Sequence, residues 1–254
     1  MKLKDKVVVV TGGGTGIGRG MCIRFAQEGA AVVVNYSKSK ERAKEVIAEI
    51  GRSGGRAIEI QADVSQDREA RQLIESAVEH FGRLDVLINN AAWTRYIPHH
   101  NLDDLSEEIL ENTWSVIVKG SIYCIRAAVP HLRAHGGGSI INITSNAGFT
   151  ARGSTIIYGA SKAALTFITK ALARALAPEI RVNAIAPGFV DTGFVNWTPE
   201  ALEQLKKQTR LGRQIIPENI ADAAVFLASD AVATTGQTIL VDGGVAALGP
   251  NERN

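Results

Sequence analysis

The chain has 254 residues, of which 45% are hydrophobic and 21% charged, and its formal net charge is +2. This composition argues against disorder, collagen-like repeats and coiled coil, and the balanced charge gives no reason to expect nucleic acid or an anionic membrane as a partner. No apolar run is long enough to span a bilayer, and from the first residues we expect no secretory signal. The two cysteines, Cys22 and Cys124, cannot form a disulfide framework, so we expect reduced thiols and a cytoplasmic protein.

Short β-branched runs alternate with helical patterns along the whole chain. The predicted strands are 7–10, 31–34, 58–61, 84–89, 139–144, 181–185 and 238–241. The predicted helices are 17–28, 40–52, 67–81, 105–135, 158–177 and 218–229. This alternation predicts an α/β fold in which about seven parallel strands form a doubly wound sandwich flanked by helices. Because no linker or repeat divides the chain, we expect one domain over 1–254, with the long irregular stretch 188–217 as a substrate-binding loop region.

A glycine-rich turn follows the first predicted strand. Gly12, Gly16 and Gly18 stand in the spacing Gly-x-x-x-Gly-x-Gly, directly before a predicted helix. Glycines at such a turn let the backbone approach a pyrophosphate, and the N-terminus of the following helix supplies N–H donors. The alternative is a glycine-rich turn that holds no ligand, but this placement between strand and helix favours a dinucleotide site.

The end of the second predicted strand bears on the choice of cofactor. NAD-selective sites place a carboxylate there for the ribose 2′-hydroxyl, whereas this chain has Asn35, Tyr36, Ser37 and Lys38. Hydroxyl groups and a lysine suit a 2′-phosphate, so we expect NADP(H) in preference to NAD(H), although NAD(H) stays possible. Lys38 and Lys40 could instead be solvated charges at the start of the next helix.

Tyr158 and Lys162 stand four positions apart on a predicted helix, so their side chains share one face. Lowering the pKa of a phenol from about 10 toward neutrality takes about 4 kcal/mol of anion stabilisation, which a nearby ammonium and an oxidised nicotinamide could supply. Ser145 follows the fifth predicted strand, where its hydroxyl could hydrogen-bond a carbonyl oxygen. A Tyr-x-x-x-Lys pattern alone is common by chance, so its weight depends on the motifs around it.

Those motifs occur in order and together resemble the short-chain dehydrogenase/reductase family of the 250-residue type. They are residues 11–18, 63–64, 89–92, Ser145, Tyr158 with Lys162, 181–188 and 242–244. The resemblance covers essentially the whole chain and is strongest to the 3-oxoacyl-ACP reductase and glucose dehydrogenase branches. It implies a single-domain Rossmann-like fold and an NAD(P)(H)-dependent oxidoreductase that transfers hydride between nicotinamide and a carbonyl or secondary alcohol. It also implies a homotetramer or a homodimer.

The resemblance assigns a role to each matching residue. Tyr158 would be the acid in reduction and the base in oxidation, Lys162 would bind the nicotinamide ribose and lower the pKa of Tyr158, and Ser145 would orient the substrate carbonyl. With the second-strand residues included, the expected cofactor-binding residues are Gly12, Thr15, Gly16, Ile17, Gly18, Asn35, Tyr36, Ser37, Asp63, Val64, Asn90, Ala91, Tyr158, Lys162, Pro187, Gly188, Val190 and Thr192. Asp63 could instead cap a turn, and Thr192 could cap a helix.

Two positions depart from the family pattern. Ala92 replaces the usual glycine after the fourth strand, which is a minor change. Ile117 stands where the family commonly has the asparagine that shapes the helix and helps to hold a proton-relay water near the lysine. Asn112 does not replace it, because it stands eight residues before Gly120, or about 12 Å along a helix. A cofactor-binding sensor or scaffold with weak catalysis is therefore an alternative function, and an epimerase or dehydratase is a more distant one.

Aromatic side chains and arginines gather in three segments expected to line the substrate cleft, 92–100, 146–157 and 189–212. The candidate substrate residues are Trp93, Arg95, Tyr96, Phe149, Arg152, Phe194 and Trp197. They suggest a medium-sized, partly apolar carbonyl compound, and Arg95 or Arg152 could clamp a carboxylate, or either could face solvent. No metal is expected, because His131 and His135 lack a third ligand nearby.

Overall fold

The computed structural model describes residues 1–195 and 199–250 and contains seven parallel strands in one sheet, in the order β3-β2-β1-β4-β5-β6-β7. The strands are β1 (Val7–Val10), β2 (Ala31–Tyr36), β3 (Arg56–Gln61), β4 (Val86–Asn89), β5 (Gly138–Ile143), β6 (Ile180–Pro187) and β7 (Thr238–Val241). The predicted doubly wound α/β fold is therefore confirmed. All four residues of β1 are buried valines, as expected for a strand covered on both faces.

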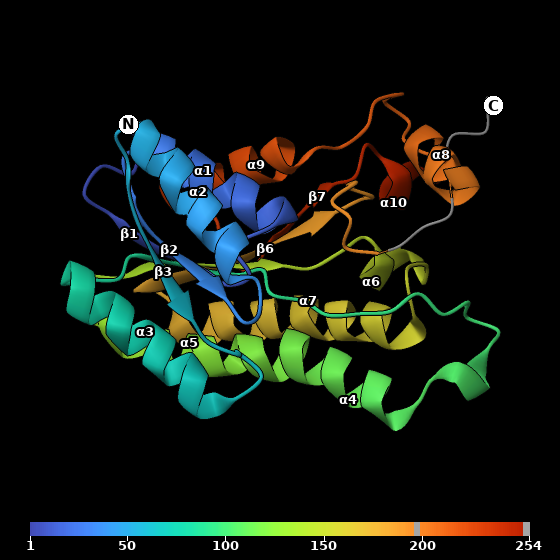
Figure 1. The fold of residues 1–254 in the computed structure, drawn as a ribbon, viewed down its shortest axis with the longest axis horizontal. Coiled ribbons are helices and arrows are strands. Elements are labelled where there is room, and N and C mark those ends of the chain that lie inside the picture. Colours follow the sequence, from blue (N-terminus) through green and yellow to red (C-terminus); the bar gives the residue numbers. More distant parts are fainter. Residues whose placement is uncertain (196–198, 251–254) are drawn as a thin grey trace.

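Helices cover both faces of the sheet (Figure 1). They are α1 (Gly16–Gln27), α2 (Lys40–Arg52), α3 (Asp67–Phe81), the 3-10 helix η1 (Leu102–Asp104), α4 (Glu107–Trp114), the π-helix η2 (Ser115–Lys119), α5 (Gly120–Ala134), α6 (Ala147–Thr150), α7 (Ile156–Leu176), α8 (Pro199–Lys207), α9 (Pro217–Ser229) and α10 (Val245–Leu248). Helices α1, α2 and α9 lie on one face, and α3, α5 and α7 on the other. Among the described helices, none combines the length and the apolar character needed to cross a membrane.

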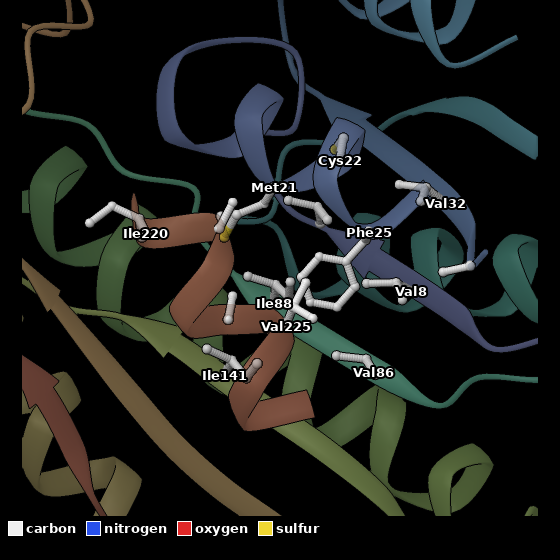
Figure 2. Close-up of a cluster of buried hydrophobic side chains, with 14 of the residues drawn as sticks. Val8, Met21, Cys22, Phe25, Val32, Val86, Ile88, Ile141, Ile220 and Val225 are labelled. Atoms are coloured by element: carbon white, nitrogen blue, oxygen red, sulfur yellow. The ribbon is translucent and has the colours of Figure 1, made fainter. Parts of the chain in front are cut away.

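One apolar core joins α1 and α9 to the sheet (Figure 2). Phe25 and Met21 of α1 are fully buried against valine and isoleucine side chains of β1 and β4, and Val225 of α9 closes the cluster. A second core on the opposite face holds Leu73 of α3 and Leu132 of α5 against the sheet. These two cores fix the sheet between its helices, so the ends of the strands hold a constant position.

The differences from the sequence prediction lie mostly outside the sheet. The stretch predicted as irregular, 188–217, contains α8. The long helix predicted over 105–135 is continuous from α4 to α5, but its middle turn is the π-helix η2. The four-residue helices α6 and α10 were not predicted, because so short an element carries no readable hydrophobic period.

Candidate active site

A large cavity of about 890 Å³ lies at the carboxyl edge of the sheet. The residues that directly follow six of the strands line it: Ser37, Ala62, Asn90, Thr144, Gly188 and Asp242. Residues of α6, α8 and α10 line it as well, and these helices gather at one end of the molecule in Figure 1. The carboxyl ends of parallel strands are where open α/β sheets bind their ligands.

In the glycine turn after β1, Gly12, Gly16 and Gly18 line the cavity with backbone atoms that no side chain covers. Gly16 has a φ of +52°, a left-handed conformation that strains residues with a Cβ. A Cβ on Gly18 would overlap the carbonyl oxygen of Gly12 and lie 2.7 Å from the Nδ2 atom of Asn90. That amide donates to the carbonyl oxygens of Thr11 (2.9 Å) and Gly12 (3.2 Å), which holds the turn in its compact form.

The N-terminus of α1 fits an anion. The first N–H groups of a helix have no partner within it, and here the Thr15 side chain does not cap them. The first turn of α1 contains no acidic residue, and Thr15, Gly16, Ile17 and Gly18 all line the cavity. Turn and helix end together are therefore suited to hold the pyrophosphate of a dinucleotide through backbone N–H groups.

Asn35, at the end of β2, links two neighbouring turns. Its Oδ1 atom accepts a hydrogen bond from the backbone N–H of Gly12 (3.1 Å), and its Nδ2 atom donates to the carbonyl oxygen of Ala62 (3.0 Å). The side chain is only 2% exposed, although it lines the cavity. Asn35 was expected to bind cofactor, but its amide is engaged in shaping the cavity wall.

Two cations lie where β2 enters α2. Lys38 and Arg42 line the cavity beside Tyr36 and Ser37, whereas Lys40 does not. Neither Lys38 nor Arg42 forms an ion pair with another described residue. Arg42 was not singled out in the sequence. Its spacing of four positions from Lys38 could have indicated it once the start of α2 was known.

The remaining expected cofactor residues all line the same cavity: Asp63, Val64, Asn90, Ala91, Pro187, Gly188, Val190 and Thr192. Asp63 also caps a turn, since its Oδ1 atom accepts hydrogen bonds from the backbone N–H (3.0 Å) and the hydroxyl (2.7 Å) of Ser65. Thr192 lies against Gly16, where a Cβ would come within 3.0 Å of it. The sequence motifs, far apart in the chain, therefore meet around one cavity.

Ser145, Tyr158 and Lys162 come together on the wall of the cavity. Thr155 caps α7 by accepting a hydrogen bond from the backbone N–H of Tyr158 (3.1 Å), which fixes the start of the helix. Ser145, in the turn after β5, forms a side-chain hydrogen bond with Tyr158. The Nζ atom of Lys162 donates to the carbonyl oxygen of Ile143 (2.7 Å) and lies 5.6 Å from the centre of the Tyr158 ring.

Burial determines the protonation of both groups. It raises the pKa of Tyr158 to about 12, and the hydrogen bond with Ser145 opposes this only in part. Burial also lowers the pKa of Lys162 to about 7. Lys162 is not among the causes of the shift in the pKa of Tyr158, because the buried amine readily loses its own charge. Tyr158 is therefore a protonated phenol at neutral pH. That Lys162 lowers the pKa of Tyr158 stays a prediction.

The structure separates the candidate substrate residues. Those that line the cavity are Trp93, Tyr96, Arg152 and Phe194. Arg95 and Phe149 do not: the Arg95 guanidinium lies 5.7 Å from the centre of the Trp93 ring, and Phe149 is 49% exposed. Trp197 lies outside the described residues. Sequence position alone could not separate these residues, because each stands in a segment that borders the cavity.

Ile117 lies in the π-helix η2 and is fully buried. It packs against Leu165 of α7 in a small apolar cluster that Tyr158 borders. Its carbonyl oxygen accepts a hydrogen bond from the Ser121 hydroxyl (2.7 Å). Position 117 therefore supplies no polar side chain. Asn112, judged too distant to replace an asparagine there, nevertheless lines the cavity.

Nothing in the described part of the chain forms a cluster of three or more His, Cys, Asp or Glu side chains suited to a metal ion. His131 and His135 stand near the end of α5. Cys22 and Cys124 are both free and buried.

Known proteins resemble this chain over nearly its whole length. The sequence family described as Enoyl-(Acyl carrier protein) reductase matches residues 12–246. The 3-oxoacyl-[acyl-carrier-protein] reductase FabG of Staphylococcus aureus is 39% identical over 247 residues, which cover 94% of this chain and 98% of that protein. Short-chain dehydrogenase/reductase SDRA of Arabidopsis thaliana is 39% identical over 251 residues, 96% of each chain.

Solved structures show the same architecture. A short-chain dehydrogenase from Burkholderia cenocepacia in complex with NADP is 34% identical with a TM-score of 0.89, covering 97% of this chain and 100% of that one. A blue fluorescent protein from a metagenomic library in complex with NADPH is 35% identical, with the same TM-score and coverage. Family match, sequence identity and fold agree: the chain belongs to the short-chain dehydrogenase/reductase family.

Proposed function

We propose that this oxidoreductase transfers hydride between a nicotinamide cofactor and a small carbonyl or secondary alcohol, with Tyr158 as the acid or base. The observation that carries the proposal is the Ser145–Tyr158–Lys162 array on the wall of a cavity that also contains the glycine turn. The glycine turn and the start of α1 would hold the pyrophosphate, and Lys162 would hold the nicotinamide ribose. When bound, the cofactor supplies the hydride.

The protein residues would handle the proton. In reduction, Ser145 donates a hydrogen bond to the substrate carbonyl oxygen, and the Tyr158 hydroxyl gives its proton to that oxygen as the carbonyl carbon becomes an alcohol. Lys162, with a pKa of about 7, can return a proton toward Tyr158 at neutral pH. Because burial keeps Tyr158 protonated, the phenol holds the proton that reduction requires.

Tyr158→Phe tests this proposal. The rate of NADPH or NADH oxidation would be followed at 340 nm against ketones, aldehydes, 3-oxoacyl thioesters and oxidised sugars. Loss of the proton donor should lower kcat by about 10²- to 10⁴-fold, while NADPH still binds with unchanged affinity. Full turnover in the variant would exclude Tyr158 as the acid.

We also propose a preference for NADP(H), supported by the cationic end of β2. Lys38 and Arg42 would pair with a 2′-phosphate, with the Ser37 hydroxyl beside them. Arg42→Ala should raise the KM for NADPH by about 10-fold or more and leave the KM for NADH nearly unchanged. Lys40→Ala is the matched control, because Lys40 lies outside the cavity lining. Equal effects on both cofactors would contradict the preference.

A cofactor-binding sensor or scaffold with weak catalysis is the second candidate, and buried Ile117 is the observation that favours it. Without a polar side chain there, proton return to Lys162 would depend on other groups. The sensor would be supported if NADPH binds tightly and the wild-type protein shows no turnover beyond that of Tyr158→Phe. Turnover lost in Tyr158→Phe would exclude it.

We propose further that the protein is cytoplasmic, that it assembles as a homotetramer or homodimer, and that its partner is a small molecule. Phe167 of α7 is 72% exposed and Ile122 of α5 is 39% exposed, which supports an apolar contact between subunits on this face. Phe167→Glu should then shift the mass measured by light scattering toward the monomer. An unchanged mass would place the contact elsewhere.

A further inference from the structure

Arg152 places an unpaired positive charge at the substrate end of the cavity. Its side chain is exposed, lines the cavity, and forms no ion pair or hydrogen bond with any described residue. The other lining cations have different positions. Lys38 and Arg42 lie at the end of β2, and Lys162 is buried with its Nζ atom bonded to a carbonyl oxygen.

The chain around Arg152 is fixed close to the catalytic phenol. The backbone carbonyl of Ser154 accepts a hydrogen bond from the N–H of Ile97 (2.8 Å), which ties the loop to the neighbouring segment. A Cβ on Gly153 would come within 3.6 Å of the Cδ1 atom of Tyr158. The residue next to Arg152 therefore borders the Tyr158 ring, and Arg152 stands in a loop that the Ser154–Ile97 hydrogen bond holds.

Arg95, the other arginine of this region, is placed differently. Its guanidinium lies 5.7 Å from the centre of the Trp93 ring and is absent from the cavity lining. Trp93 itself lines the cavity, so the two neighbours have separate environments. The structure thus distinguishes the two arginines that the sequence left equivalent.

Three aromatic residues line the same cavity as Arg152. Trp93, Tyr96 and Phe194 line the cavity, and the Phe194 ring lies 6.4 Å from that of Tyr158. Three aromatic rings and one unpaired guanidinium on the lining of one cavity are complementary to a molecule with an apolar body and a carboxylate.

We propose that the physiological substrate class is oxo acids with an apolar body, and that Arg152 determines this specificity by binding their carboxylate. This inference rests on the proposed function. A hydrogen-bonded ion pair of this kind corresponds to about a 10- to 100-fold preference over a neutral analogue. Because the carboxylate is remote from the reacting carbon, the preference should appear mainly in KM.

The test compares acids with their methyl esters. The probes are 4-oxo-4-phenylbutanoate and 5-oxo-5-phenylpentanoate, each beside its methyl ester, with NADPH as reductant. We expect the wild-type kcat/KM to favour the acid by about 10- to 100-fold in at least one pair. Arg152→Gln should remove that preference through KM, and Arg152→Lys should retain part of it. Arg95→Gln is the matched control, because Arg95 does not line the cavity, and this variant should retain the full preference for the acid.

A binding measurement separates this inference from the proposed function. The unreactive 4-phenylbutanoate is titrated into the protein while tryptophan fluorescence is followed, with 4-phenylbutanamide as the neutral control. Tighter binding of the acid that requires Arg152 would support the anion site, and absence of turnover for every pair and for the wider carbonyl panel would then contradict the reductase alone. The anion site would be contradicted if the esters are reduced as well as the acids, or if the preference for acids persists in Arg152→Gln. Either result would be compatible with the proposed reductase.

Discussion

Replacing Lys162 by methionine should stabilise the protein at neutral pH while abolishing its activity. Lys162 is 2% exposed, and burial lowers its pKa from 10.5 to about 7. Between these two values the unfolded chain holds a proton that the folded protein has released. The stability of the wild-type protein therefore rises with pH across this range. Methionine has a similar unbranched shape and no charge, so this dependence should vanish in the variant.

The size of the effect follows from the two pKa values. Because the folded protein binds the proton of Lys162 less tightly than the unfolded chain, the free energy of unfolding is lowered by about 4 kcal/mol at pH 7 and by about 2 kcal/mol at pH 9. Methionine also leaves the carbonyl of Ile143 without its hydrogen bond, which costs about 1–3 kcal/mol at either pH. The net gain at pH 7 is thus about 1–3 kcal/mol. The difference in the free energy of unfolding between variant and wild type should fall by about 2 kcal/mol from pH 7 to pH 9. Changes in packing do not affect this fall, because they are the same at both pH values.

Urea unfolding at one protein concentration, followed by circular dichroism at both pH values, measures this difference. Lys170→Met is the matched control, because Lys170 lies on the same helix with an exposed side chain, and its effect on stability should not change with pH. A Lys162→Met difference that stays constant between pH 7 and pH 9 would refute the reasoning. Such a result would mean that Lys162 is charged in the folded protein.

Three further outcomes are expected. Gly18→Ala should weaken NADPH binding at least about 10-fold in a fluorescence titration, because its methyl group would overlap the Gly12 carbonyl; Gly51→Ala, with open space around it, should bind normally. Ile117→Asn should lower the free energy of unfolding by about 2–4 kcal/mol, since it buries an amide in an apolar cluster; a gain in turnover despite this loss would show that proton return is impaired in the wild type. Cys22 and Cys124 should resist a thiol reagent at pH 8 until the protein is denatured, because burial raises the pKa of both thiols. Fast reaction of the native protein would contradict their burial.

The parts of the molecule that the sequence predicts well are those governed by local rules. The valine run of β1, the glycine turn and the start of α1 follow one another directly, so a strand, a turn and a helix N-terminus can be placed without tertiary information. The spacing of Tyr158 and Lys162 fixes their shared face in the same way, once α7 is a helix.

The parts that the sequence could not predict depend on contacts between distant segments. Arg95 and Arg152 have the same chemistry and stand in neighbouring loops of the cavity wall, and only the fold shows which of them lines it. The protonation of Tyr158 is a similar case. Its pKa depends on how much protein surrounds the ring, and burial outweighs the lysine that spacing alone would emphasise.

Asn35 shows how a position read as a cofactor contact can serve the fold. Its amide accepts from Gly12 and donates to Ala62, so it needs both an acceptor and a donor. A carboxylate at this position would keep the acceptor, but it would turn its second oxygen toward the carbonyl of Ala62 and lose a hydrogen bond in a buried place. The chain therefore has a structural reason to lack an acid at position 35, independent of the cofactor. In the proposed function, selection between NADP(H) and NAD(H) would then depend on the side chains that follow, among which Lys38 and Arg42 are the charged ones that line the cavity.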